Sequence, residues 1–153
     1  MTEEEYVDWY PRAISEYAED HIKAGSMPAD TAHDLAAKQF AELLPDGLAT
    51  PAHHLLVGEV DDVRVGILWL NIPVEGEAIR AFVYDVEVEP DHRGKGYGRG
   101  IMVGAESYSR DLGAGMIRLH VFGENTVARS LYTSLGYVET NVSMAKPLTA
   151  APR

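Results

Sequence analysis

The stretch that decides the fold reads His92-Arg93-Gly94-Lys95-Gly96-Tyr97-Gly98-Arg99-Gly100. It follows a strand-like segment at 82–88 and precedes an amphipathic segment that begins at Ile101. Glycines let the backbone adopt a positive φ and approach a ligand closely, and a helix start offers unpaired N–H groups and the positive end of the helix dipole. A strand, a glycine-dense loop and a helix start in this order predict a site that holds a phosphate group. The loop also supplies positive charge through Arg93, Lys95 and Arg99.

The composition suits one domain and limits the classes of partner. The chain has 153 residues, of which 46% are apolar, enough for a single core. Its 24 acidic and 13 basic residues give a formal net charge of −11. This balance argues against a nucleic-acid binder, because such proteins neutralise phosphates. It favours a cationic partner such as an amine, although an acidic surface also serves solubility.

The absence of cysteine excludes disulfides, thiolate metal sites and cysteine nucleophiles. The histidines show no spacing typical of metal ligands, so we predict no metal. The acidic residues 1–5 do not form the apolar run of a signal peptide, and no apolar stretch is long enough to span a bilayer. We therefore expect a cytoplasmic protein without a membrane partner.

Two helices are expected at the start of the chain. Thr2 and Glu5 have the spacing of a capping box, and the apolar residues that follow recur at helical spacing. Pro11 interrupts this run and is expected to kink or restart the helix. A second helix is predicted from a first turn at Pro28 to Leu44.

The rest of the chain mixes strands and helices. The pattern predicts strands at 54–60, 63–71 and about 78–88, a helix after the glycine loop to about 112, a strand at 116–122, a helix at 125–135 and one or two short strands within 137–146. We expect an α/β fold with an α+β mixed sheet: an antiparallel meander, then β-loop-α-β-α-β, with helices on both faces. Residues 1–153 are predicted to form one domain, with helices in 1–47 and the sheet and core in 53–147.

Spacing separates this loop from two common glycine loops. A P-loop needs a hydroxyl residue after its lysine, whereas Lys95 is followed by Gly96. A dinucleotide-binding loop needs a third glycine at a fixed distance, and Arg99 and Ile101 stand at the two positions where that glycine would fall.

The loop does resemble that of the GNAT superfamily of N-acetyltransferases, whose acetyl-coenzyme A loop reads [QR]-x-x-G-x-[GA]. Arg93, Gly96 and Gly98 match this pattern, and 86–90 resembles the hydrophobic strand that leads into it. A second hallmark of the family, an Asn followed by Leu-Tyr-x-x-Leu-Gly-[FY], is matched within 125–137. The resemblance covers about residues 57–137. Members often begin with a strand before the first helix, and this chain has only a few residues there.

This resemblance implies an acyltransferase that moves an acetyl group from acetyl-CoA to a primary amine by direct transfer in a ternary complex. The main chain of Val86 and Val88 would pair with the cofactor arm, and Asn125 would contact the cofactor. Tyr132 would protonate the coenzyme A thiolate; it lies two helical turns after Asn125, on the same face. The pyrophosphate would be held by the backbone amides of Arg93, Gly94, Lys95, Gly96, Tyr97, Gly98 and Arg99.

Three alternatives remain for the base that deprotonates the amine. His120 is preferred narrowly: histidine ordinarily titrates near neutral pH, and relatives that act on ribosomal-protein N-termini carry a glutamate at the matching position. Glu87 is the second alternative, because it shares a strand face with Asp85 and Glu89 and neighbouring carboxylates raise one another's pKa. A chain of water molecules is the third. For Asp85 and Glu89 themselves, a solvated strand face is the favoured interpretation.

The acceptor is expected on the side of the first two helices, as in the family. The first helix carries Tyr6, Trp9, Tyr10 and Tyr17, and aromatic faces attract cations; core packing is the commoner role of such a stripe. The acceptor would be a small-molecule amine or a protein amino group, and a homodimer is possible. Two other functions stay open: an acyl-CoA-binding regulatory or sensor module without turnover, and a transferase of another acyl group.

Overall fold

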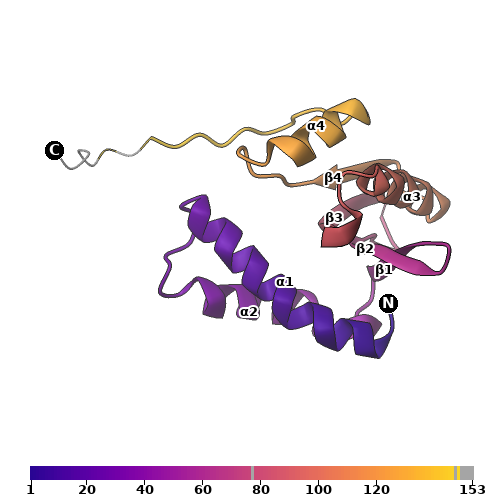
Figure 1. Cartoon of the computed structure of the whole chain (residues 1–153), viewed down its shortest axis with the longest axis horizontal. Helices are drawn as coiled ribbons and strands as arrows, with labels where there is room; N and C mark the ends of the chain where they lie inside the picture. The colour runs from indigo at the N-terminus through magenta and orange to yellow at the C-terminus, as the bar shows by residue number, and fades with distance from the viewer. Residues whose placement is uncertain (77, 147, 149–153) are drawn as a thin grey trace. The chain divides into compact units, whose positions relative to one another are not determined.

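A computed structural model of the chain describes residues 1–76, 78–146 and 148. The chain forms two compact units, Met1–Phe122 and Gly123–Arg153. The expectation of one domain over 1–153 stays a prediction. The elements in Figure 1 are α1 (Glu3–Lys23), α2 (Ala32–Leu43), β1 (His53–Val60), β2 (Val63–Asn71), β3 (Arg80–Val88), α3 (Tyr97–Asp111) and β4 (Met116–Leu119) in the first unit, and α4 (Thr126–Ser134) in the second.

The first unit is built on a mixed sheet with the strand order β1-β2-β3-β4. The pairs β1–β2 and β2–β3 are antiparallel, and β3–β4 is parallel. The parallel pair requires a crossover, which α3 supplies. The predicted α/β fold with its antiparallel meander is confirmed.

Helices cover both faces of this sheet, as predicted. On one face, Ile67 and Trp69 of β2 pack in a core cluster with Trp9 of α1 and Phe40 of α2. Side chains alternate along a strand, so Gly66 points to the opposite face. A Cβ atom built on Gly66 would meet the side chain of Ile101, which belongs to α3. The helices α1 and α2 thus lie on one face and α3 on the other.

The start of α1 agrees with its sequence signals, but the helix does not restart at Pro11. The Glu5 N–H donates to Thr2 Oγ1 (3.2 Å), and the Thr2 N–H donates to Glu5 Oε2 (2.7 Å), which completes the predicted capping box. Pro11 lies inside the continuous helix. Proline has no N–H, so the carbonyl of Val7 lacks its usual helical hydrogen bond. Val7 is 67% exposed, so water can satisfy that carbonyl.

Two predicted boundaries of the first unit were wrong. Helix α2 starts at Ala32 rather than Pro28, because residues 29–31 form a turn and the N-cap Thr31 has a non-helical φ of −123°. Strand β4 ends at Leu119 instead of reaching 122, because its ladder with β3 stops at the pair Val83–Leu119. His120, predicted within this strand, therefore lies just beyond its end.

In the second unit, Asn125 caps α4 by accepting the Ala128 N–H at 3.1 Å. The strands expected within 137–146 are not formed. Val138, Val142 and Met144 alternate as in a strand but are exposed. A strand is stabilised by a hydrogen-bonded neighbour, so alternation alone does not produce one.

Candidate active site

The outer edge of β3 is open near its C-terminal end. In the described part of the chain, β3 pairs with β4 only over Arg80–Val83, although β3 continues to Val88. The Glu89 N–H donates to the carbonyl of Val65 on β2 at 2.9 Å. Main-chain groups alternate in direction along a strand, so those of Val88 and Val86 point away from β2. They face the open edge, which supports their predicted pairing with a cofactor arm.

A β-bulge lies where the two ladders of β3 part. Trp69 pairs with Asp85 and Leu70 pairs with Val83, which leaves Tyr84 as the extra residue. The Tyr84 ring stacks on Trp69, with ring centroids 4.7 Å apart, and Asp85 Oδ2 accepts a hydrogen bond from Trp9 Nε1 at 3.3 Å. The bulge therefore directs two consecutive side chains toward the face covered by α1 and α2.

The glycine loop leads from this edge into α3. Gly94 and Gly96 have φ angles of 73° and 85°, the left-handed region that side chains disfavour. Gly96 is the N-cap of α3 and provides no side-chain hydrogen bond to the first turn. A helix start without a side-chain cap, at the end of an open strand edge, has the donor set that a pyrophosphate requires.

Two of the three basic side chains of the loop, those of Arg93 and Lys95, contact main-chain carbonyls. Arg93 Nε donates to Val88 O at 3.0 Å, and Lys95 Nζ donates to Asp91 O at 2.8 Å. Both side chains therefore help to fix the conformation of the loop that follows β3. Because Arg93 already contacts the Val88 carbonyl, the groups left on the open edge are those of Val86 and the N–H of Val88.

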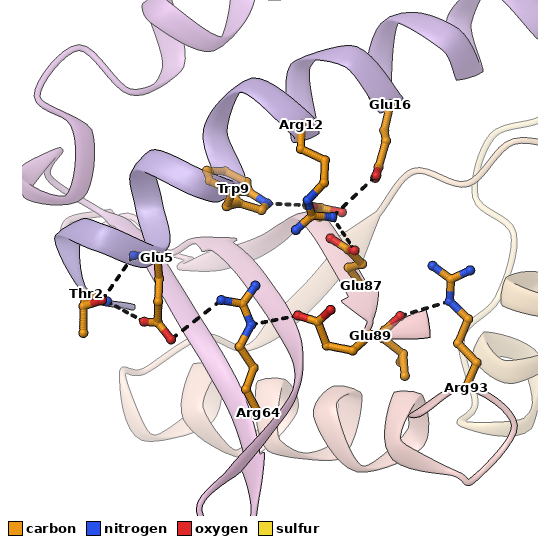
Figure 2. A network of polar contacts seen from close by, with 11 residues as sticks. Thr2, Glu5, Trp9, Arg12, Glu16, Arg64, Glu87, Glu89 and Arg93 are labelled. Carbon is orange, nitrogen blue, oxygen red and sulfur yellow. Dashed lines mark hydrogen bonds and ion pairs between the residues drawn. The ribbon is translucent and has the colours of Figure 1, made fainter. Parts of the chain in front are cut away.

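The acidic face of β3 is covered by α1 and is not the solvated face that the sequence suggested. Arg12 of α1 forms an ion pair with Glu87, whose side chain is 13% exposed, and also contacts Glu16 at 3.4 Å. Glu89 accepts from Arg64 Nε at 2.8 Å. Figure 2 shows Arg12 between Glu16 and Glu87, and a separate group in which Arg64 of β2 lies between Glu5 and Glu89.

Asp85 is the carboxylate of this face with the most altered chemistry. Burial raises the pKa of Asp85 to about 6; the hydrogen bond from Trp9 and the charge of Arg12 oppose this rise, and the negative charges of Glu87 and Glu16 add to it. A half-buried carboxyl that titrates near neutral pH is a candidate acid or base. The sequence correctly placed Asp85 on one strand face with Glu87 and Glu89, but it gave no indication that α1 covers this face.

His120 lies away from these carboxylates in the contacts that the structure describes. Its ring meets Phe122 edge-on at 5.3 Å, and Phe122 meets His21 of α1 at 5.1 Å. His21 lies on Tyr17, with ring centroids 4.3 Å apart. Burial lowers the pKa of His21, and the nearby charge of His120 lowers it further. His120 thus belongs to an aromatic group at the C-terminal end of α1.

The aromatic stripe of α1 is mainly core. Trp9 is fully buried and contacts Phe40 and Trp69, so the hypothesis that Trp9 faces a cationic acceptor was wrong. Tyr17 stays partly exposed, and burial and the nearby Tyr84 raise the pKa of its hydroxyl group. Packing against the sheet buries the ring at the centre of the stripe, because large apolar side chains belong more often to the core than to an exposed face.

Asn125 and Tyr132 belong to the second unit. The Asn125 side chain caps α4, so its oxygen already accepts a hydrogen bond. The Tyr132 ring contacts the Tyr137 ring, with centroids 5.7 Å apart. Their predicted roles at the cofactor stay predictions.

The open strand edge of β3 thus leads through the glycine loop into a helix start that has no side-chain cap. The chain belongs to the acetyltransferase (GNAT) family, whose model matches residues 9–137. It is therefore an N-acetyltransferase of the acyltransferase class.

Named relatives agree with this assignment. The chain is 36% identical to YycN of Bacillus subtilis (strain 168), described as an uncharacterized N-acetyltransferase, over 97% of this chain and 96% of that protein. The crystal structure of YycN superposes with a TM-score of 0.93 and covers 98% of this chain and 96% of its own. Mycothiol acetyltransferase of Nocardiopsis dassonvillei is 40% identical over 88% of this chain, which matches 40% of that longer protein.

More distant structures share the fold. The aminoglycoside N-acetyltransferase AAC(6')-Iy in complex with CoA is 16% identical, with a TM-score of 0.56, over 77% of this chain and 78% of its own. Among the described residues, no helix is long and apolar enough to cross a membrane.

Proposed function

We propose that this protein transfers the acetyl group of acetyl-CoA to a primary amine. The observation that carries the proposal is the continuity of the open edge at Val86 and Val88 with the uncapped start of α3 at Gly96. These two features suit the two parts of coenzyme A: an amide-rich arm that adds to a strand edge, and a pyrophosphate that lies on a helix N-terminus.

The residues divide between cofactor and chemistry. The amides from Arg93 to Arg99 hold the pyrophosphate, the main chain of Val86 and Val88 holds the arm, and Asn125 adds a contact. Tyr132 protonates the leaving thiolate. The amine's proton leaves through His120, Glu87 or water, the alternatives that the sequence leaves open.

Direct transfer is part of the proposal. The chain has no cysteine, so no acetyl-cysteine forms on the enzyme, and we propose that the acceptor attacks the thioester while both substrates are bound. We therefore expect intersecting initial-rate lines when acetyl-CoA and the amine are varied together. Parallel lines would contradict direct transfer.

Turnover is tested with acetyl-CoA and a panel of spermidine, kanamycin, a lysine-containing peptide and a dipeptide with a free N-terminus. The expected result is release of free coenzyme A together with a product 42 Da heavier than one of these amines (about 42 is the mass of an acetyl group less one hydrogen). Binding of coenzyme A without turnover on any amine would favour the sensor function. Turnover with succinyl- or propionyl-CoA but not acetyl-CoA would favour another acyl group.

A further inference from the structure

We propose that Asp85, rather than Glu87, takes the proton of the acceptor's ammonium group, and that Arg12 is the positioning residue that decides between these two carboxylates. The proposal rests on the proposed acetyl transfer. It assigns a role to a polar network that connects α1 with the open half of β3 (Figure 2).

Asp85 lies in the part of β3 beyond the pairing with β4. It directly precedes Val86, whose main chain faces the open edge. The Asp85 side chain lies on the face of the sheet that α1 covers, where Trp9 Nε1 donates a hydrogen bond to it. Asp85 is therefore placed between the edge proposed for the cofactor arm and the helices that are expected to border the acceptor.

Glu87 is engaged by Arg12 of α1. Arg12 Nη1 contacts both Glu87 Oε1 and Glu16 Oε1. A guanidinium group does not lose its proton at accessible pH and only donates hydrogen bonds. Glu87 is therefore already engaged by a group that only donates, and the acceptor's ammonium would have to displace Arg12 to reach it.

Asp85 differs from Glu87, because its hydrogen-bond partner is the neutral indole of Trp9. The charged groups that face it are Arg12 and Glu16 from α1 and Glu87 from β3, while its β2 partner Trp69 does not titrate. Burial raises the pKa of Asp85 to about 6. A carboxylate of this basicity is ionised at pH 7–8 and still accepts a proton at small cost.

The proton and bonds balance as follows. The ammonium gives one proton to the Asp85 carboxylate, directly or through one water, and its nitrogen lone pair forms the bond to the acetyl carbon. The carbon–sulfur bond breaks, and the sulfur takes a proton from Tyr132. The second proton of the nitrogen restores the Tyr132 hydroxyl through solvent, and Asp85 releases its proton to water before the next cycle.

The kinetic test measures pH profiles of kcat/KM with whichever panel amine is turned over fastest. Asp85→Asn is expected to lower kcat/KM by ~10²–10⁴-fold, the usual contribution of a general base, while Glu87→Gln loses much less. Arg12→Gln moves the acid limb of the profile to higher pH, because the Arg12 charge opposes the rise in the pKa of Asp85. Arg12→Lys restores part of that change. Lys23→Gln is the matched control: Lys23 is another exposed cation of α1 and pairs locally with Asp20.

A second readout needs no turnover. Carboxyl-labelled aspartate allows the Asp85 side chain to be titrated by ¹³C NMR in the whole protein. Asp85 is expected to titrate near 6 in the wild type, higher in Arg12→Gln and unchanged in Lys23→Gln. If the pKa of Asp85 is the same in Arg12→Gln as in the wild type, the positioning role of Arg12 is overturned, whatever that substitution does to stability.

The outcomes separate this proposal from the proposed function. If acetyl-CoA is consumed and Asp85→Asn keeps wild-type kcat/KM, while Glu87→Gln or His120→Ala loses it, then Asp85 is overturned and acetyl transfer stands. If no amine is acetylated although coenzyme A binds, acetyl transfer falls and the role of Asp85 falls with it.

Discussion

Asp85 and Glu87 are neighbours on one strand face, yet they have different surroundings. Glu87 has a guanidinium partner, whereas Asp85 has an indole N–H. Strand alternation in the sequence correctly put both on one face. It did not predict that this face is covered, because the covering side chain, Trp9, lies 76 residues away from Asp85 in the chain. Contacts of such sequence separation leave no local signal.

The raised pKa of Asp85 predicts a pH-dependent stability. Its value of about 6 exceeds the ordinary ~3.9 of an unfolded chain, so the folded state binds the proton more tightly. The stabilisation from this group is present below about pH 4 and is lost as the pH rises through about 6. Asp85→Asn keeps an oxygen for Trp9 and carries no charge. The variant should therefore gain stability relative to wild type by about 2 kcal/mol between pH 4 and pH 8.

Urea unfolding at both pH values measures this difference. Glu42→Gln serves as the control, because Glu42 pairs with Lys38 on the exposed side of α2. An Asp85→Asn difference that stays constant with pH would remove Asp85 as a titrating buried group.

Tyr132 supports a prediction that separates catalysis from binding. Tyr132→Phe removes only the hydroxyl that would protonate the thiolate, so kcat is expected to fall by ~10²-fold or more while the affinity for coenzyme A is nearly unchanged. Steady-state kinetics together with calorimetry measure the two quantities. An unchanged kcat would exclude Tyr132 as the acid.

At the scale of elements, the sequence predicted those features that local chemistry determines. The capping box of α1, the glycine loop and the start of α3 each depend on residues within a few positions of one another. The end of β4 depends instead on where β3 bulges, at Tyr84, and the continuity of α1 through Pro11 depends on the exposure of Val7. Such long-range pairing and burial are absent from a local pattern.

The packing of α3 on the sheet predicts a stability effect at Gly66. A Cβ atom there would lie 2.2 Å from the Glu87 carbonyl oxygen and 2.7 Å from Ile101 Cδ1. The backbone oxygen cannot move without disturbing the β2–β3 ladder, so Gly66→Ala is expected to destabilise the protein by about 1–3 kcal/mol. Gly104→Ala, in α3 with no atom within 4 Å of its Cβ position, is the matched control and should be neutral or stabilising. Equal unfolding midpoints in urea would contradict this packing.

At the scale of the whole molecule, the sequence constrains the fold more than the acceptor. The glycine loop was predicted from 92–100 and lies in the first unit, as does the open edge at Val86 and Val88, whose pairing with the cofactor the family resemblance implied. The acceptor is recognised by side chains from separate elements, and its choice depends on the shape that they form together. A net charge of −11 favours a cation but does not select one.

Binding of coenzyme A is the most direct test of the site formed by β3 and the glycine loop. Calorimetric titration of the protein with acetyl-CoA, coenzyme A and ATP in turn compares the whole cofactor with a nucleotide that lacks the arm. We expect both coenzyme A forms to bind and ATP not to bind, because ATP lacks the arm that would pair with the open edge of β3 and has only its phosphates for the helix start. If neither coenzyme A form binds, the glycine loop is only a turn between β3 and α3, and every role assigned around it is contradicted.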